Sequence, residues 1–219
     1  MKKPDVLNLL FKEKNPAPWT IVLLFILAHL VLAMMMLFTF PVINDQIGTH
    51  AFDLQTFGYS SDLAFQILSK LDASTIQWYL FPQLFLLDII YPFLLATALS
   101  ALLRRLYQLI KGKSTQFLSL VSLLPFVAMV CDYTENLHIA YMITHIDNIR
   151  EGVIASASLF TILKSLFTTI SWVLILVLGL QWIISKLLRS GIKPDPSGSS
   201  GAEVISVPCR KVGSTLHTE

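Results

Sequence analysis

Long apolar runs are the feature of this 219-residue sequence that most constrains its fold. A helix that crosses the hydrocarbon core of a bilayer needs about 20 mostly apolar residues. Backbone N–H and C=O groups find no partner in lipid, so a continuous apolar run crosses it as a helix that satisfies them internally. The runs long enough to do so cover residues 19–42, 78–103, 116–143 and 153–187. The sequence therefore predicts an all-α, polytopic membrane protein with four transmembrane helices.

The composition identifies the lipid bilayer as the main partner of such a chain. Hydrophobic residues make up 54% of the sequence and charged residues only 14%, whereas soluble domains carry about 25% charged residues. The net charge of +2 gives no basis for nucleic-acid binding. The first run follows several lysines, as a signal peptide does, but it is too long and has no small-residue cleavage site, so we expect it to be retained. A homo-oligomer or a membrane partner is compatible with this composition.

The distribution of lysine and arginine predicts the orientation. The N-terminal segment 1–18 carries four lysines and the 104–113 loop carries four basic residues, whereas the loops at 43–77 and 144–152 are richer in acidic residues. Cytoplasmic loops of membrane proteins collect Lys and Arg. We therefore expect both termini in the cytoplasm and the protein in the cell membrane, with a bacterial inner membrane favoured. The tail at 188–219 is rich in Pro, Gly and Ser and is expected to be disordered.

The outer loop, residues 43–77, contains a short amphipathic pattern. Ser60 or Ser61 can cap a helix there. Its apolar residues repeat at helical spacing on one face, namely Leu63, Ala64, Ile67, Leu68 and Leu71. We predict a short helix that rests on the outer membrane surface or covers the mouth of the bundle, with docking of a partner as the alternative.

Ionisable residues occur inside every apolar run at a similar depth. His29, Asp88, Asp132 and Lys164 each lie about ten residues from the predicted outer end of their run, which is roughly 15 Å by the helical rise. A charge at the centre of an inserted helix costs about 2.5–3.5 kcal/mol. Because this cost is reduced when the groups face one another, we predict one polar layer across the bundle.

The helical positions of these residues suggest which faces meet. At about 100° per residue, Asp132, Glu135 and Asn136 share one face of the third span, and Lys164 lies in a hydroxyl-rich stripe of the fourth. We predict that Lys164 contacts Asp132 or Asp88. The acids still outnumber the base, so the remainder must bind a proton, a cation, water or a partner. The candidate ligand- or proton-binding residues are Asp88, Asp132, Glu135, Asn136, Lys164 and His29.

Pro92 adds a backbone acceptor to this layer. It follows Asp88 by four residues, and a proline at that position removes the hydrogen bond to the Asp88 carbonyl. Free carbonyls of interrupted helices recur at ion sites in membranes.

These features are compatible with more than one function. The first reading is a structural or assembly subunit, in which the charges hold the helices in register. The alternative is a protein that binds or transports a proton, a cation or a small amphiphile through Asp88, Asp132, Glu135 and Lys164. A second alternative is an intramembrane enzyme, with His29, His138, Asp88 and Asp132 as metal ligands or an acid pair for proton transfer. No H-x-x-x-H or G-x-S-x-G motif supports it. We therefore predict no catalytic residue, metal or cofactor.

Overall fold

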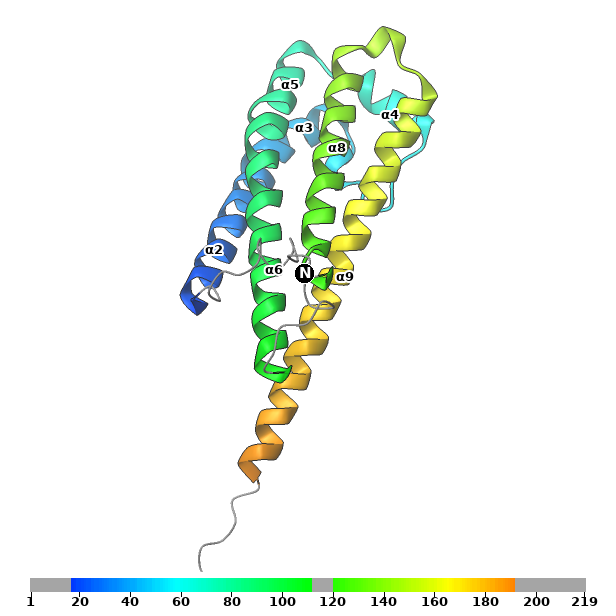
Figure 1. The fold of residues 1–219 in the computed structure, drawn as a ribbon. Helices are drawn as coiled ribbons and strands as arrows, with labels where there is room; N and C mark the ends of the chain where they lie inside the picture. Colours follow the sequence, from blue (N-terminus) through cyan, green and yellow to red (C-terminus); the bar gives the residue numbers. More distant parts are fainter. Residues whose placement is uncertain (1–16, 112–119, 192–219) are drawn as a thin grey trace, which may run out of the picture.

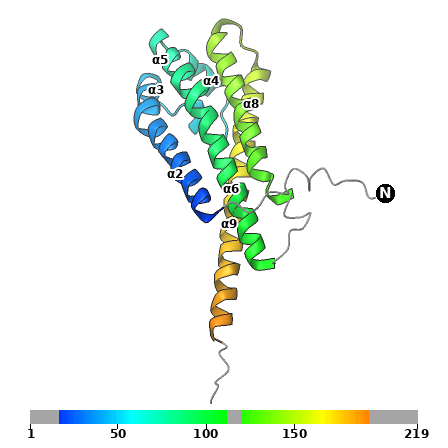
Figure 2. The same cartoon turned by 60° about the vertical axis from the view of Figure 1, so that its left-hand side comes forward.

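The computed structural model describes residues 17–111 and 120–191, and within those ranges the chain is helical and contains no strand (Figure 1). The long helices are α2 (Pro18–Met34), α6 (Asp88–Lys111), α8 (Leu124–Thr144) and α9 (Glu151–Gly191). They run up and down in turn, with α8 beside α9 and α2 lying obliquely against α6 (Figures 1 and 2).

Apolar helices confirm three of the predicted runs. Among the described residues, three helical stretches are long and apolar enough to cross a membrane, namely Pro18–Ile47, Ala73–Ile110 and Glu151–Leu188. Their mean hydropathies are 2.9, 2.0 and 2.0. They contain the runs predicted at 19–42, 78–103 and 153–187, and each helix extends beyond the predicted bounds.

The run predicted at 116–143 differs most from the structure. Its helix, α8, begins only at Leu124 and has 21 residues. Pro125 lies in the first turn, where a missing N–H breaks no helical hydrogen bond, so the proline starts this helix instead of lying inside it. The face of α8 that carries Asp132 and Glu135 is buried in the bundle. The polarity of this face explains why α8 does not stand out as an apolar span.

The second apolar helix is interrupted near its start. It consists of α5 (Ala73–Trp78), the π-helical segment η3 (Tyr79–Leu87) and α6. Phe81 has extended backbone angles, φ −145° and ψ 121°, because Pro82 follows it and disfavours the helical conformation. This kink changes the direction of the helix before it reaches Asp88.

The ends of the chain lie mostly outside the described residues. The predicted segment 1–18 overlaps the structure only at its end, where α2 begins at Pro18. The predicted tail, 188–219, overlaps it only at the end of α9. That helix has 41 residues and is about 60 Å long by the helical rise. It projects beyond the other helices at the end opposite α4 (Figure 1).

The 43–77 segment is folded against one end of the bundle, which we call the loop end. The first helix continues through the π-helical η1 (Met35–Thr39) into α3 (Phe40–Ile47), followed by the short 3-10 helix η2 (Phe52–Leu54) and by α4 (Ser61–Leu68). Ser60 caps α4, accepting a hydrogen bond from the Leu63 N–H at 3.3 Å. This confirms the predicted amphipathic helix and its cap.

The apolar face of α4 packs onto the bundle. Ala64, Ile67 and Leu68 are buried in the main core together with residues of α8 and α9, including Ile143 and Ile154. Helix α4 thus covers the loop end, beside α9 (Figure 1). A further 3-10 helix, η4 (Ile146–Asn148), connects α8 to α9 at this end.

Candidate functional site

An ion cluster joins α8 to α9. The Lys164 Nζ atom lies 2.8 Å from Asp132 Oδ1 and 2.6 Å from Glu135 Oε2. The Glu135 side chain is fully buried, and its other oxygen, Oε1, accepts a hydrogen bond of 2.7 Å from the Thr161 hydroxyl. Asp132 and Glu135 lie three residues apart on α8, and Thr161 and Lys164 lie three residues apart on α9. Residues at this spacing share one face of a helix, so the two pairs meet where α8 packs against α9. The predicted contact between Lys164 and Asp132 is confirmed.

Helix α8 also binds the backbone that Pro92 leaves free in α6. The Asn136 Nδ2 atom donates to the Asp88 carbonyl at 3.4 Å, and the Tyr133 hydroxyl donates to the neighbouring Ile89 carbonyl at 2.7 Å. The first of these bonds is long, since N–H···O bonds are usually 2.7–3.2 Å. The predicted free acceptor at Asp88 is therefore present and is used to hold α6 against α8.

Asp53 belongs to the cluster, and sequence reasoning missed it. It lies on η2 in the 43–77 segment, where it counted only as a loop charge. Its Oδ2 atom accepts a hydrogen bond of 2.8 Å from the Tyr79 hydroxyl, which in turn accepts one from the Phe52 N–H at 2.9 Å. Asp53 and Asp88 line the same cavity, and each has one buried carboxylate oxygen without a partner among the described residues. No periodicity in the sequence shows that this loop folds inward.

A close contact between backbone and α9 holds this loop in place. Gly58 has a positive φ of +81°, and a Cβ there would lie 2.6 Å from Ser158 Oγ and 2.9 Å from Ile162 Cδ1. The next residue, Tyr59, donates its backbone N–H to Ser158 Oγ at 2.8 Å. Only glycine combines the positive φ of Gly58 with so close an approach to α9.

Burial raises the pKa of the Tyr59 hydroxyl, and the negative charge of Glu135 raises it further.

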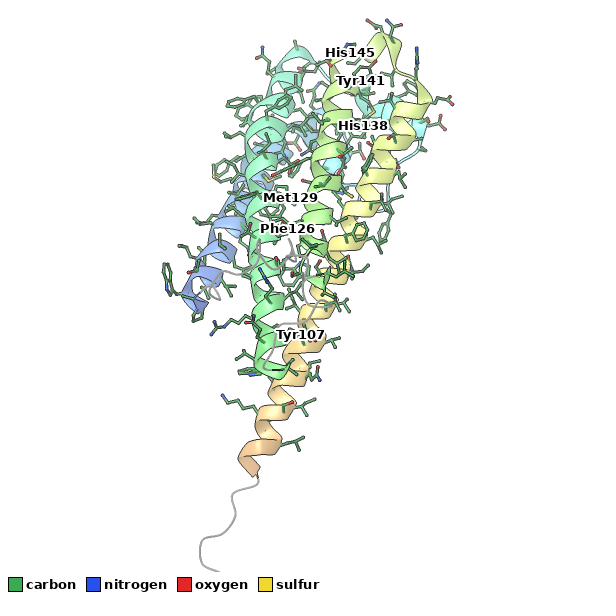
Figure 3. All side chains as sticks on the ribbon, in the orientation of Figure 1. Tyr107, Phe126, Met129, His138, Tyr141 and His145 are labelled. Carbon is green, nitrogen blue, oxygen red and sulfur yellow. The ribbon has the colours of Figure 1, made fainter. Side chains whose placement is uncertain are left out.

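Three of the acids line a partly open cavity of about 290 Å³ between the helices. Its polar lining comes from the loop, α6, α8 and α9, through Asp53, Asp88, Asp132 and Lys164. Its remaining wall is largely apolar and includes Met35, Phe40, Leu95, Leu99 and Met129. Figure 3 places Met129 on α8, above Phe126. The volume is close to the lower limit of small-molecule pockets, about 300–1,000 Å³.

Several carboxylate oxygens of this cavity lack a donor. Asp53 Oδ1, Asp88 Oδ2 and Asp132 Oδ2 are buried and have no hydrogen-bond partner within residues 17–111 and 120–191. Asp88 is only 3% exposed. Leaving a buried polar group unpaired costs about 1–3 kcal/mol and more when the group is charged. In folded proteins, such atoms usually mark a place for water, an ion or a ligand.

His29 and His138 do not join the acids. The His29 ring is exposed on α2, and its Nδ1 atom is hydrogen-bonded to the Phe25 carbonyl of its own helix at 2.8 Å. The His138 Nδ1 atom lies 2.7 Å from the Thr134 carbonyl, also on its own helix, and its ring packs against Phe160. Figure 3 shows His138 with Tyr141 and His145 along the loop end of α8. In the described ranges, no three His, Cys, Asp or Glu side chains are arranged to hold a metal ion.

Comparison with protein-family models, with curated proteins and with solved structures gives no significant match, so the function is argued from the site itself.

Proposed function

We propose that this chain is a four-span membrane protein that binds a small amphiphile in the cavity between its helices. The head of the ligand lies among Asp53, Asp88, Asp132 and Lys164, and its apolar part lies along the wall toward Leu95 and Leu99. Both termini are cytoplasmic, and the loop end faces outward.

The observation that carries the proposal is that a largely apolar cavity is lined at one end by buried carboxylate oxygens that accept no hydrogen bond from the described residues. An apolar cavity alone would suit lipid or a void, and a paired acid cluster alone would suit a structural role. Asp88 is buried, lines the cavity and has an Oδ2 atom without a donor among the described residues. Apolar pockets with a few convergent polar groups are typical of ligand sites.

A purely structural role explains only half of the cluster. In that reading, each acid has a partner within the chain or across an oligomer. Lys164 and Thr161 meet this requirement for Asp132 and Glu135. Asp53 and Asp88 line the same cavity without a cation of the described residues beside them, and two nearby carboxylates repel one another unless a proton or a cation lies between them.

The topology rests on α8 as the fourth span. Its 21 residues reach about 30 Å, enough to cross the hydrocarbon core. Its polar face is turned to α6 and α9, where a spanning helix must place its ionisable groups. Four spans put both termini on one side, and the basic segments 1–18 and 104–113 make that side the cytoplasm.

The test is the thermal stability of the full-length protein in a nonionic detergent with straight-chain C6–C10 alcohols, amines and carboxylates. We expect at least one series to raise Tm saturably, because a ligand that binds only the folded state stabilises it. Ala128→Phe fills the cavity from α8 and is expected to abolish the shift, as is Leu95→Phe from α6. Ala155→Phe, at an exposed position of α9, is the matched control. The proposal is wrong if no compound raises Tm, or if both cavity-filling variants respond as the wild type does.

A further inference from the structure

The geometry points to a primary ammonium group as the head of the ligand, exchanged on binding for a proton shared by Asp53 and Asp88. This inference rests on the proposed function and names the ligand class of the same site.

The charges of the cluster are unevenly compensated. Lys164 lies within ion-pair distance of Asp132 and Glu135. Asp53 and Asp88 have no cation within salt-bridge distance in the part of the chain that the structure describes. Asp53 is held by a neutral donor, the Tyr79 hydroxyl. A cationic ligand therefore compensates the half of the cluster that the protein leaves negative.

The hydrogen-bonding groups favour a donor over an acceptor. Among the described residues, the oxygens without partners at this end of the cavity belong to Asp53, Asp88 and Asp132. The ammonium of Lys164 is already engaged by two carboxylates. A carboxylate or phosphate head would be repelled by the carboxylates of Asp53, Asp88 and Asp132, which line this end of the cavity. A hydroxyl offers one donor hydrogen, whereas an ammonium offers three, one for each of the three acids.

Asp53 and Asp88, which each leave one carboxylate oxygen unpartnered at the same cavity, supply the exchanged proton. A hydrogen bond between two carboxyl groups requires one proton, since carboxylates only accept. A proton between Asp53 Oδ1 and Asp88 Oδ2 gives both oxygens a partner when the cavity has no ligand. When R–NH₃⁺ enters, it donates to both carboxylates and the shared H⁺ leaves, so the charge of the site is unchanged and no covalent bond forms or breaks in the ligand.

Other ionisable groups face this pair from each surrounding element. On the first helix, the cavity lining is apolar, through Met35 and Phe40. The ionisable neighbours on the other elements are Tyr79 on η3, Tyr91 on α6, Asp132 and Glu135 on α8, and Lys164 on α9. Lys164 attracts negative charge and the two α8 acids repel it. The number of protons released when the ligand binds therefore reports on Asp53 and Asp88 together with these neighbours.

The cavity volume sets the size of the ligand. The volume of about 290 Å³ is close to the lower limit of small-molecule pockets, about 300–1,000 Å³. It suits an ammonium head with a single short alkyl chain. We therefore use n-octylamine as the probe, with octan-1-ol and octanoate as neutral and anionic analogues of the same chain length.

The experiment is isothermal titration calorimetry of the full-length protein in a nonionic detergent at pH 7, in phosphate and in Tris buffers. The heats of ionisation of these buffers differ, so the two titrations give the number of protons released. We expect saturable binding of n-octylamine, about tenfold weaker binding of octan-1-ol, no binding of octanoate, and about one proton released for each amine bound.

Variants show whether the two acids are responsible. Asp88→Asn and, independently, Asp53→Asn are expected to weaken amine binding about tenfold and to abolish proton release. Asp147→Asn, which removes an exposed carboxylate at the same end of the bundle, is expected to change neither quantity. Asp53 lies in the loop, so its variant serves if Asp88→Asn does not fold.

The outcomes separate the two proposals. Equal binding of octan-1-ol and n-octylamine, unchanged binding by both Asn variants, or amine binding without proton release overturns the inference of ammonium–proton exchange. Binding of octan-1-ol or octanoate but not of the amine overturns it as well and leaves the amphiphile site standing. If no compound of the three binds saturably, the proposed function and this inference both fail.

Discussion

Replacing Lys164 with methionine tests whether the ion cluster stabilises the fold. The substitution keeps a long unbranched side chain and removes the ammonium that lies 2.8 Å from Asp132 and 2.6 Å from Glu135. Two carboxylates then remain close together, and Glu135 is completely buried. Thr161 still donates to Glu135, but a neutral hydroxyl does not compensate two charges.

The expected loss in the free energy of unfolding is about 3 kcal/mol. Removing one partner of a buried ion pair costs about 3–5 kcal/mol, because it leaves an uncompensated charge. The Lys164 side chain is 15% exposed and lines the cavity, so we expect a value near the lower limit. The matched control is Lys186→Met at an exposed position of α9, where a contact with the Trp182 ring is lost. An exposed cation–π contact contributes about 0.5–1 kcal/mol.

The assay is equilibrium unfolding in mixed micelles of the wild type, Lys164→Met, the double variant Asp132→Asn/Glu135→Gln and the triple variant. If the loss is electrostatic, the triple variant recovers most of it, since it strands no charge. If the losses of Lys164→Met and of the double variant simply add in the triple variant, the reasoning is refuted. Lys164 would then stabilise the bundle by packing. A loss no larger than that of Lys186→Met would refute it too.

Further single substitutions test the loop at Gly58, the burial of Tyr59 and the hydrogen bond from α8 to α6. Gly58→Ala is expected to cost about 1–3 kcal/mol in unfolding free energy because of its positive φ and its contacts with α9, whereas Gly152→Ala, with nothing within 4 Å of its added Cβ, should stay within about 0.5 kcal/mol of the wild type; equal effects would contradict the loop geometry. The pKa of Tyr59 is higher in the folded protein than in the unfolded chain, where it is near 10. The folded state therefore keeps the proton to higher pH, and the free energy of unfolding should fall as the pH rises above 10. Tyr59→Phe should lack this loss, which is at most about 1.4 kcal/mol per pH unit; parallel pH profiles of unfolding would count against a buried Tyr59. Tyr133→Phe removes the 2.7 Å hydrogen bond to the Ile89 carbonyl and should cost about 0.6 kcal/mol in the same unfolding assay. No loss would show that α6 is held against α8 without this bond.

The sequence predicts the apolar helices and one ion pair because both follow from local periodicity. Apolar length identifies the helices that contain 19–42, 78–103 and 153–187, and the shared faces of Asp132 and Lys164 predict their contact. The boundaries are less accurate. The run at 116–143 places Pro125 inside a span, whereas the structure places it in the first turn of α8.

The remainder of the site depends on tertiary structure. Depth along a helix places His29 at the level of the acids, but α2 is apolar all round, so nothing in its sequence fixes its rotation. The structure leaves His29 exposed and bonded to its own helix. Asp53 lines the same cavity as Asp88 because the loop folds inward over Tyr79 and is held at Gly58. Such a placement has no periodic signature in the sequence.

The central claim is that Asp88 is present to bind a ligand and not to hold the helices together. The most direct measurement is the unfolding free energy of Asp88→Asn beside that of the wild type, each with and without n-octylamine. Without the amine, we expect the variant to be as stable as the wild type or more so, because an amide donates to Asp53 without an added proton and the buried charge is gone. With saturating amine, the wild type should gain about 1.4 kcal/mol more stability than the variant, because the variant binds the amine about tenfold more weakly. A variant that loses more than about 2 kcal/mol without ligand, or that gains as much from the amine as the wild type does, would contradict the claim.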